Sequence, residues 1–318
     1  MAVYTQVSAE ALADFLTKFD AGELVSAKGI AEGVENSNYL VDTTKARFIL
    51  TLYEKRVAAG DLPYFMALLE HLATRGNPVP PAIPDRDGRV IHELAGRPAC
   101  LIQFLQGVSV THPTPAQAHA AAEAMGRMHA SLADFTGHRV NSMGVDTWAA
   151  QLARCGRDLD AIEPGLFDHA RAAVDRILAA WPRGLATSAV HADLFPDNVL
   201  MLGDRVTGLI DFYFACTDVR AYDLAVMHGA WAFDAQGRAY DPAIGAALLR
   251  GYRASFGLTP EEQAALPILA EGAALRFFLS RAWDWLNTPA DAMVTRKDPL
   301  AYRRRLDFYA ENGQRLFA

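Results

Sequence analysis

The chain has 318 residues, about half of them apolar, and a net charge of −7. This length suits two lobes or one large unit better than a single small domain, and the negative charge argues against a protein that coats nucleic acid. No apolar stretch reaches the roughly 18 residues of a membrane-spanning helix, and the N-terminus has no signal-peptide pattern. The widely spaced Cys100, Cys155 and Cys216 fit reduced thiols. We therefore expect a cytoplasmic protein that acts on a small molecule, with no nucleic-acid or membrane partner.

The first hundred or so residues predict a small antiparallel sheet with one inserted helix. A short opening helix is expected at "SAEALADFLTKF", after a Ser start signal. The inserted helix is expected at "DLPYFMALLEHLATRG", between a starting Asp and a closing Gly. The expected strands are, in chain order, "ELVSAKGIAEG", "NSNYLVDTT", "ARFILTLYEK", "RVIHEL" and "PACLIQFL". The last two are joined by "AGR", which predicts a hairpin.

The remaining chain is mostly helical in pattern. The helices are expected at 113–135, 146–160, 167–181, 242–256, 260–287 and 299–316. Two short apolar runs, "NVLML" and "VTGLI", flank "GD" and predict a β-hairpin within this helical region. We place the boundary between two lobes near residues 104–110, which gives an N-terminal lobe of 1–105 and a C-terminal lobe of 106–318.

A run of polar residues precedes this hairpin, and an acidic residue follows it. Asp193 and Asn198 lie in "VHADLFPDNVLM", and Asp211 closes the second strand in "GLIDFYFACTD". A hairpin brings the start of its first strand beside the end of its second, so Asn198 should lie close to Asp211. Two oxygen ligands at one place suit Mg²⁺, which binds through one or two carboxylates plus substrate phosphates. Asp193 would be placed to accept a proton from a substrate hydroxyl.

The arrangement matches the phosphoryl-transfer loop H-R-D-x-x-x-x-N followed by a metal-binding Asp. Two positions depart from it, because Ala192 replaces the Arg and Tyr213 replaces the Gly of D-F-G. The alternative interpretation is a polar turn with a chance pattern of Asx residues. We expect His191 to brace the loop by hydrogen bonds rather than to transfer a proton.

The chain resembles the aminoglycoside-phosphotransferase-like kinase superfamily in "GIAEGVENSNYLV", "RFILTLYEK", "HLATRGNPVPPAI", "VHADLFPDNVL", "GLIDFYFACTDVRAYDLAV" and "ALRFFLSRAWDWL". The resemblance implies an α+β, protein-kinase-like two-lobed fold with a small antiparallel-sheet N-terminal lobe and a mainly helical C-terminal lobe. Within the superfamily, the runs "ENSNY", "TLYE" and "DFYFAC" resemble the bacterial branch that uses ATP and Mg²⁺ to phosphorylate L-homoserine in threonine biosynthesis. Kinases of choline, hydroxylysine, an aminoglycoside or a sugar remain alternatives, as does a nucleotide-binding pseudokinase.

The resemblance also implies roles for individual residues. Asp193 matches the catalytic base, and Asn198 and Asp211 match the Mg²⁺ ligands. The turn "GVENSN" matches the segment over the nucleotide phosphates, so backbone N–H groups near Ser37 and Asn38 would bind phosphate; an ordinary hairpin turn is the alternative. "LIQFLQG" matches the hinge, where backbone groups of Gln103 and Leu105 would pair with the adenine edge, although a buried strand needs no such role.

One departure concerns the ion pair that usually holds the nucleotide phosphates. Thr51 occupies the position of the usual Lys, and the position of its Glu partner falls near Phe65. Losing both halves is self-consistent, because losing the Lys alone would leave a buried carboxylate unpaired. Lys55 or Arg56 would be the nearest substitutes, although surface solvation is the simpler expectation for each.

A zwitterionic amino acid needs a cation for its carboxylate and an acceptor for its ammonium group. In "ALRFFLSRAWDWLN", Arg276 and Asp284 fall on one helical face. Arg276 or Arg281, together with Asp284, would supply both groups; an intrahelical salt bridge is the alternative. We expect Asp223 to start a helix and to support the loop that holds Asp211.

Overall fold

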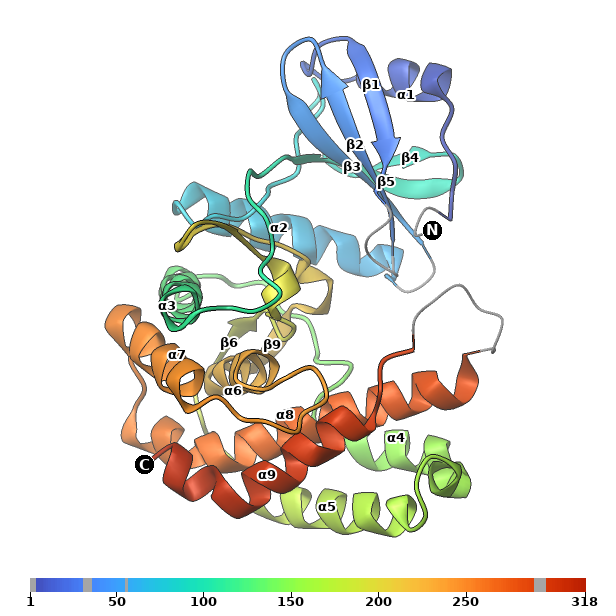
Figure 1. Ribbon diagram of the computed structural model, residues 1–318. Coiled ribbons are helices and arrows are strands. Elements are labelled where there is room, and N and C mark those ends of the chain that lie inside the picture. The colour runs from blue at the N-terminus through green and yellow to red at the C-terminus, as the bar shows by residue number, and fades with distance from the viewer. Residues whose placement is uncertain (1–3, 31–35, 55–56, 289–295) are drawn as a thin grey trace.

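The computed structural model describes residues 4–30, 36–54, 57–288 and 296–318. The chain forms two parts, which lie one above the other in Figure 1: a β-sheet flanked by a helix, and a larger body made mainly of helices. The predicted α+β architecture, in which a small antiparallel sheet precedes a mainly helical region, is confirmed.

Five strands form the sheet in the order β1-β2-β3-β5-β4, and each neighbouring pair is antiparallel. The strands are Leu24–Gly29 (β1), Asn36–Thr43 (β2), Arg47–Tyr53 (β3), His92–Leu94 (β4) and Arg97–Gln103 (β5). The hairpin predicted at "AGR" closes through Ala95 and Gly96, whose φ angles of 53° and 71° are those that a tight two-residue turn requires. All five predicted strands are present.

The two faces of the sheet belong to different apolar cores. Successive side chains of a strand point to opposite faces. Leu50 and Leu52 of β3 are therefore buried with helix α1 (Ala9–Leu16), whose first turn is capped by the Ser8 hydroxyl as predicted. Tyr53, on the opposite face, is buried in the main core of the helical body. The sheet thus turns one face to α1 and the other to the rest of the protein.

Helix α2 (Leu62–Thr74) follows β3 in sequence but packs with the helical body. A short 3₁₀ turn, Ala59–Asp61, leads into it. Phe65 and Leu69 of α2 are buried in the same cluster as the large helices of the C-terminal half. Figure 1 shows α2 lying between the sheet and those helices. The packing of α2 therefore crosses the sequence boundary that we predict near residue 105.

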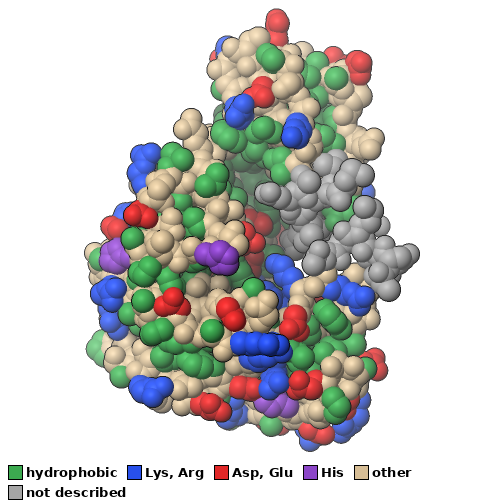
Figure 2. Space-filling model, viewed as in Figure 1, with side chains coloured by type: hydrophobic (Ala, Val, Ile, Leu, Met, Phe, Trp, Pro, Cys, Tyr) green, Lys and Arg blue, Asp and Glu red, His purple; other side chains and the backbone are tan. Residues whose placement is uncertain are grey.

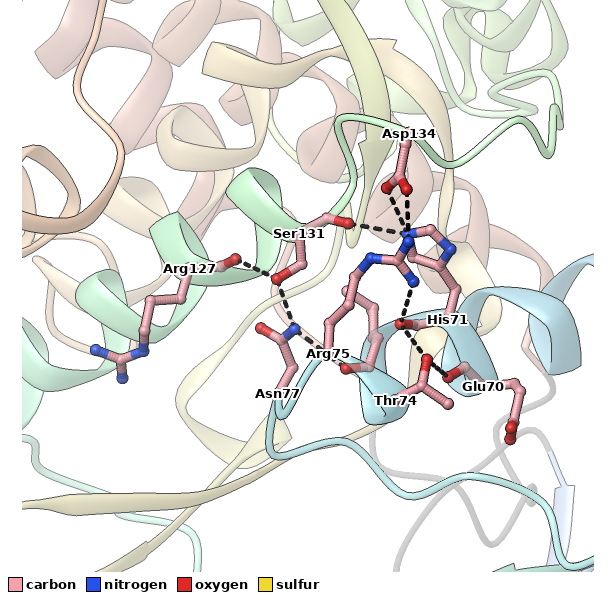
Figure 3. A network of polar contacts seen from close by, with 9 residues as sticks. Glu70, His71, Thr74, Arg75, Asn77, Arg127, Ser131 and Asp134 are labelled. Carbon is pink, nitrogen blue, oxygen red and sulfur yellow. Dashed lines mark hydrogen bonds and ion pairs between the residues drawn. The ribbon is translucent and has the colours of Figure 1, made fainter.

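The C-terminal end of α2 is tied to the end of α3 (Pro115–Ser131) by the polar network in Figure 3. The buried amide of Asn77 donates hydrogen bonds to the Leu72 carbonyl (3.1 Å) and to the Ser131 hydroxyl (2.8 Å). His71 Nε2 lies 2.9 Å from the Ser131 carbonyl oxygen. These contacts fix the helix beneath the sheet to the helix that begins the second part of the chain.

Within the described residues, the helical body contains α3, α4 (Trp148–Cys155), α5 (Leu166–Ala180), α6 (Arg220–Trp231), α7 (Pro242–Ser255), α8 (Pro260–Asn287) and α9 (Leu300–Leu316). The six helices predicted after residue 106 are confirmed. Helix α6 was expected only from Asp223 and not from an apolar period, because it is buried on almost every side and so lacks the one-sided apolar pattern of a surface helix. In Figure 1, α8 and α9 run side by side across the lower part of the molecule. No described helix is long and apolar enough to span a membrane.

Two small two-stranded sheets belong to the C-terminal part of the chain. β7 (Val199–Leu202) and β8 (Arg205–Leu209) form the predicted hairpin. A second pair, β6 (Thr187–Val190) with β9 (Cys216–Val219), brackets that hairpin in sequence. This pair was not predicted, because its four-residue strands are far apart along the chain and no turn signal joins them.

The network between α2 and α3 should contribute measurably to stability. Asn77→Ala is expected to lower the free energy of unfolding by roughly 1–3 kcal/mol, because the Ser131 hydroxyl and the Leu72 carbonyl lose the donor that they share. Urea unfolding of the full chain measures this loss. Arg75→Ala, which removes an exposed ion pair with Asp134, is the control and should move the midpoint very little. Equal losses in the two variants would contradict a stabilising role for the buried amide.

Candidate active site

The loop between β6 and β7 carries Asp193 and is held by a buried carboxylate. Asp223 of α6 is fully buried, and its two oxygens accept hydrogen bonds from the main-chain N–H groups of His191 (2.8 Å) and Ala192 (2.7 Å). Ala192 has the left-handed φ of 62°, which turns the chain directly before Asp193. Asp223 therefore fixes the backbone on which Asp193 is mounted.

A third contact comes from α3, where His129 Nε2 lies 3.1 Å from the Asp223 carboxylate. Burial by itself raises the pKa of Asp223, but the hydrogen bond and charge of His129, with the loop amides, bring the pKa below its ordinary value. The carboxylate is thus held in its charged form.

The position of Asp223 confirms one part of our prediction and corrects another. It stands at the start of a helix, in the first turn of α6, after the cap residue Val219. It binds the loop that leads into Asp193, not the loop that holds Asp211.

His191 connects the loop that carries Asp193 to the segment that leads into Asp211. Its side chain is fully buried, and its Nε2 lies 2.9 Å from the carbonyl oxygen of Ile210, the residue before Asp211. The Asp193 N–H donates to His191 Nδ1 at 3.3 Å. Burial lowers the pKa of His191, which favours the neutral ring. The predicted bracing role of His191 is confirmed by these hydrogen bonds.

Asn198 and the residues before Asp211 meet at the open end of the β7–β8 hairpin. The Ile210 N–H donates to the Asn198 carbonyl at 3.0 Å, so Asp211 follows directly beside Asn198, as predicted. The Asn198 amide nitrogen donates to the Asp193 carbonyl at 2.8 Å, which leaves its Oδ1 as an acceptor. Asp211 has a left-handed backbone, with φ of 65°. An amide oxygen and a carboxylate are the hard donors that suit Mg²⁺, so the residues present fit that ion.

The positions of the usual Lys–Glu ion pair are filled by uncharged groups. The Thr51 hydroxyl donates to the Asn38 side-chain oxygen at 2.8 Å, and Phe65 is fully buried. Tyr213 packs its ring against Phe65, with centroids 5.7 Å apart, and its hydroxyl lies 3.2 Å from that of Tyr53. The joint loss of Lys and Glu is therefore matched by a packed contact between the segment after Asp211 and the sheet. Lys55 and Arg56 lie outside the described residues.

Sequence reasoning noted Tyr213 only as a departure from D-F-G and missed its contact with the sheet. A large side chain at a position that is usually glycine was the available signal. Burial raises the pKa of Tyr213, so its hydroxyl remains protonated.

The residues predicted to lie near the nucleotide belong to the sheet or to the segment directly after β5. Ser37 and Asn38 belong to β2, and residues 33–35 of the predicted phosphate turn lie outside the described ranges. The buried Ser37 hydroxyl donates to Glu54 at 2.8 Å and accepts from the Tyr4 N–H. Both side chains therefore have partners within the protein, and their contact with phosphate stays a prediction.

Gln103 ends β5, and Leu105 follows it at the predicted hinge. The Gln103 N–H donates to the Pro81 carbonyl at 3.0 Å. Among the described residues, Leu105 makes no hydrogen bond between backbone groups. The Leu105 backbone is thus available for an adenine edge, and this contact also stays a prediction.

The three residues predicted to bind substrate all lie on α8 but differ in how deeply their side chains are buried. Arg276 is buried and donates to the Ala192 carbonyl, so it contacts the backbone of the Asp193 loop. Arg281 is partly buried and lies over the Tyr302 ring, 4.4 Å from its centroid. Asp284 is exposed near the end of the helix. In Figure 2, Asp or Glu side chains lie inside the hollow between the two parts, with Lys or Arg side chains just below them.

The chain is similar to catalogued enzymes over nearly its whole length. Residues 26–258 match the model of the phosphotransferase enzyme family (APH). A homoserine kinase of Zymomonas mobilis is 51% identical, and the match covers 98% of each chain. A homoserine kinase of Granulibacter bethesdensis is also 51% identical, with 97% of each chain covered.

Solved structures show the same fold at lower identity. A microcompartment-associated aminopropanol kinase superposes with a TM-score of 0.74 at 20% identity, covering 98% of this chain and 99% of that one. A spectinomycin phosphotransferase in complex with ADP and spectinomycin gives a TM-score of 0.72 at 13% identity, covering 97% and 99%. With the family model matched over most of its length and relatives about half identical throughout, this chain belongs to the phosphotransferase enzyme family and is a kinase.

Proposed function

We propose that this protein transfers the γ-phosphoryl group of ATP to the hydroxyl of L-homoserine and so forms O-phospho-L-homoserine, a step of threonine biosynthesis, in the cytoplasm. The observation that carries the proposal is the loop in which Asp223 clamps the amides of His191 and Ala192, so that Asp193 stands beside Asn198. The choice of homoserine rests on the relatives of about 50% identity that bear the name homoserine kinase.

Asp193 acts as the base in this proposal. It orients the homoserine hydroxyl and takes its proton as the hydroxyl oxygen attacks the γ-phosphorus of ATP. A bond forms between that oxygen and the γ-phosphorus, and the bond from the γ-phosphorus to the oxygen bridging the β-phosphate breaks. ADP leaves with that bridging oxygen. His191, Asp223 and Arg276 contribute by fixing the loop backbone and do not exchange protons with substrate.

Asn198 Oδ1 and the Asp211 carboxylate would hold Mg²⁺, which neutralises the charge that develops on the phosphate oxygens. Leu105 N–H and the Gln103 carbonyl would pair with the adenine edge, where β5 ends and the two lobes, 1–105 and 106–318, join. Backbone groups near Ser37 and Asn38 would approach the phosphates from the sheet.

The substrate assignment is tested by ADP release from Mg·ATP on a panel of hydroxyl compounds. L-Homoserine is expected to give a kcat/KM at least tenfold above choline, ethanolamine and spectinomycin. Preferred turnover of one of these other compounds would refute the homoserine assignment.

Replacing the base should affect turnover more than nucleotide binding. Asp193→Asn keeps the size of the side chain but removes the proton acceptor, so kcat should fall by roughly 10²–10⁴-fold. Calorimetry should find ATP affinity nearly unchanged, since Asp193 faces the substrate hydroxyl in this proposal. The matched control is Asp204→Asn at the exposed far end of the same hairpin, which should keep parental activity. A parallel fall in ATP affinity would instead place Asp193 in the nucleotide site.

The metal assignment predicts a different signature for Asp211. Asp211→Asn removes the negative charge of one of the two proposed ligands, so kcat/KM for Mg·ATP should fall about a hundredfold or more. The Mg²⁺ concentration that saturates turnover should also be higher in the variant than in the parent. A Mg²⁺ titration of turnover, with Asp204→Asn as control, measures both effects. An unchanged Mg²⁺ requirement would remove Asp211 from the metal site.

A further inference from the structure

Three arginines from α8 and α9 gather around one buried tyrosine next to the Asp193 loop. Arg276 and Arg281 come from α8, and Arg305 and Tyr302 come from α9. The guanidinium carbons of Arg281 and Arg305 lie 4.4 and 4.3 Å from the centroid of the Tyr302 ring. Two cations thus share one aromatic ring.

Aromatic contacts join this cluster to the catalytic loop. Phe277 packs against Tyr302, with centroids 4.9 Å apart, and against Phe195, with centroids 5.0 Å apart. Phe195 lies two residues after Asp193. Asp193 is also among the charges that act on Arg281 and on Tyr302. The cluster is therefore next to the base and on the side of the loop formed by α8 and α9.

Direct ion pairs do not neutralise the positive charge of this cluster within the described residues, and Asp193 and Asp298 act on Arg281 only from a longer distance. Among the described residues, no carboxylate forms an ion pair with Arg276, Arg281 or Arg305. Arg276 and Arg305 instead donate to main-chain carbonyls, those of Ala192 and Asp234. By contrast, Arg303 in the same α9 pairs with Glu163 at 3.0 Å.

Polar atoms of the cluster that have no hydrogen-bond partner also indicate a missing partner. Within the described residues, Arg276 Nε, Arg305 Nε and Tyr302 Oη are buried without a hydrogen-bond partner. Buried charged and polar groups are costly unless they are paired. Cations and a hydroxyl that gather without a direct ion pair favour an anion as the missing partner, and a carboxylate suits the fork of donors on arginine.

We propose that Arg281 and Arg305, with the Tyr302 hydroxyl, form the subsite that binds the substrate carboxylate. This inference rests on the proposed function, in which the substrate is an amino acid that carries its hydroxyl a short carbon chain away from the carboxylate. Arg276 holds the Asp193 loop against this subsite. The subsite makes the enzyme select hydroxy amino acids over amino alcohols that lack a carboxylate.

The test compares L-homoserine with 3-aminopropan-1-ol, which keeps the hydroxyl and the amine but lacks the carboxylate. The parent protein should favour homoserine by a hundredfold or more in kcat/KM, because an unfilled ion-binding site rejects the analogue. Arg281→Met should lower kcat/KM for homoserine about a hundredfold, mainly through KM, while it affects the analogue and the KM for ATP far less. Arg281→Lys should recover part of the loss, and Tyr302→Phe should act on homoserine alone. Arg315→Met, an exposed change on α9, is the matched control and should behave like the parent.

The outcomes separate this inference from the proposed function. Equal losses on homoserine and on its analogue in folded Arg281→Met and Arg281→Lys proteins would overturn the carboxylate subsite and leave the homoserine assignment intact. A raised KM for ATP alone would assign the cluster to a nucleotide phosphate and would also overturn the inference. If the parent preferred another hydroxy amino acid, such as L-serine, the subsite would stand and the homoserine assignment would fail. Preference for amino alcohols would refute both.

Discussion

The buried carboxylate of Asp223 is the contact on which the rest of the site depends. It accepts hydrogen bonds from two successive loop amides and from His129, so three separate elements converge on one charge. A buried carboxylate that has no contact with water needs such partners, since each lost hydrogen bond leaves its charge less well compensated. The loop before Asp193 therefore has little freedom. His191 passes this constraint on to the residue before Asp211 through its bond to the Ile210 carbonyl.

The usual buried Lys–Glu pair between sheet and helices is replaced by aromatic packing and by contacts of Arg139. Tyr213, two residues after Asp211, contacts Phe65 of α2 and Tyr53 of the sheet. Arg139 donates to the carbonyl of Ala215 and pairs with Asp61, just before α2. Both contacts fasten the segment after Asp211 to the region around α2. The segment that follows Asp211 is thus fastened without a buried Lys–Glu pair.

Charge is divided between two sides of the Asp193 loop. Asp211 and Asn198 Oδ1 offer oxygen donors to a cation at the open end of the hairpin, while Arg281 and Arg305 concentrate positive charge between α8 and α9. A phosphoryl transfer to a zwitterion needs both environments, because metal and carboxylate must be bound separately while the hydroxyl reaches the base. Asp193, between them, interacts with the second group.

The sequence by itself determined the elements with strong local signals and the short hairpin around which the candidate site lies. Periodicity and caps marked the long helices and the five strands, and the spacing of Asp193, Asn198 and Asp211 followed from one short hairpin. Only the tertiary structure decided which residues brace that loop and which gather beside it. The β6–β9 pair, the target of Asp223 and the meeting of Arg281 with Arg305 all join segments that are far apart in the chain. Such contacts leave no local period or turn signal, because they depend on how whole helices and strands pack together.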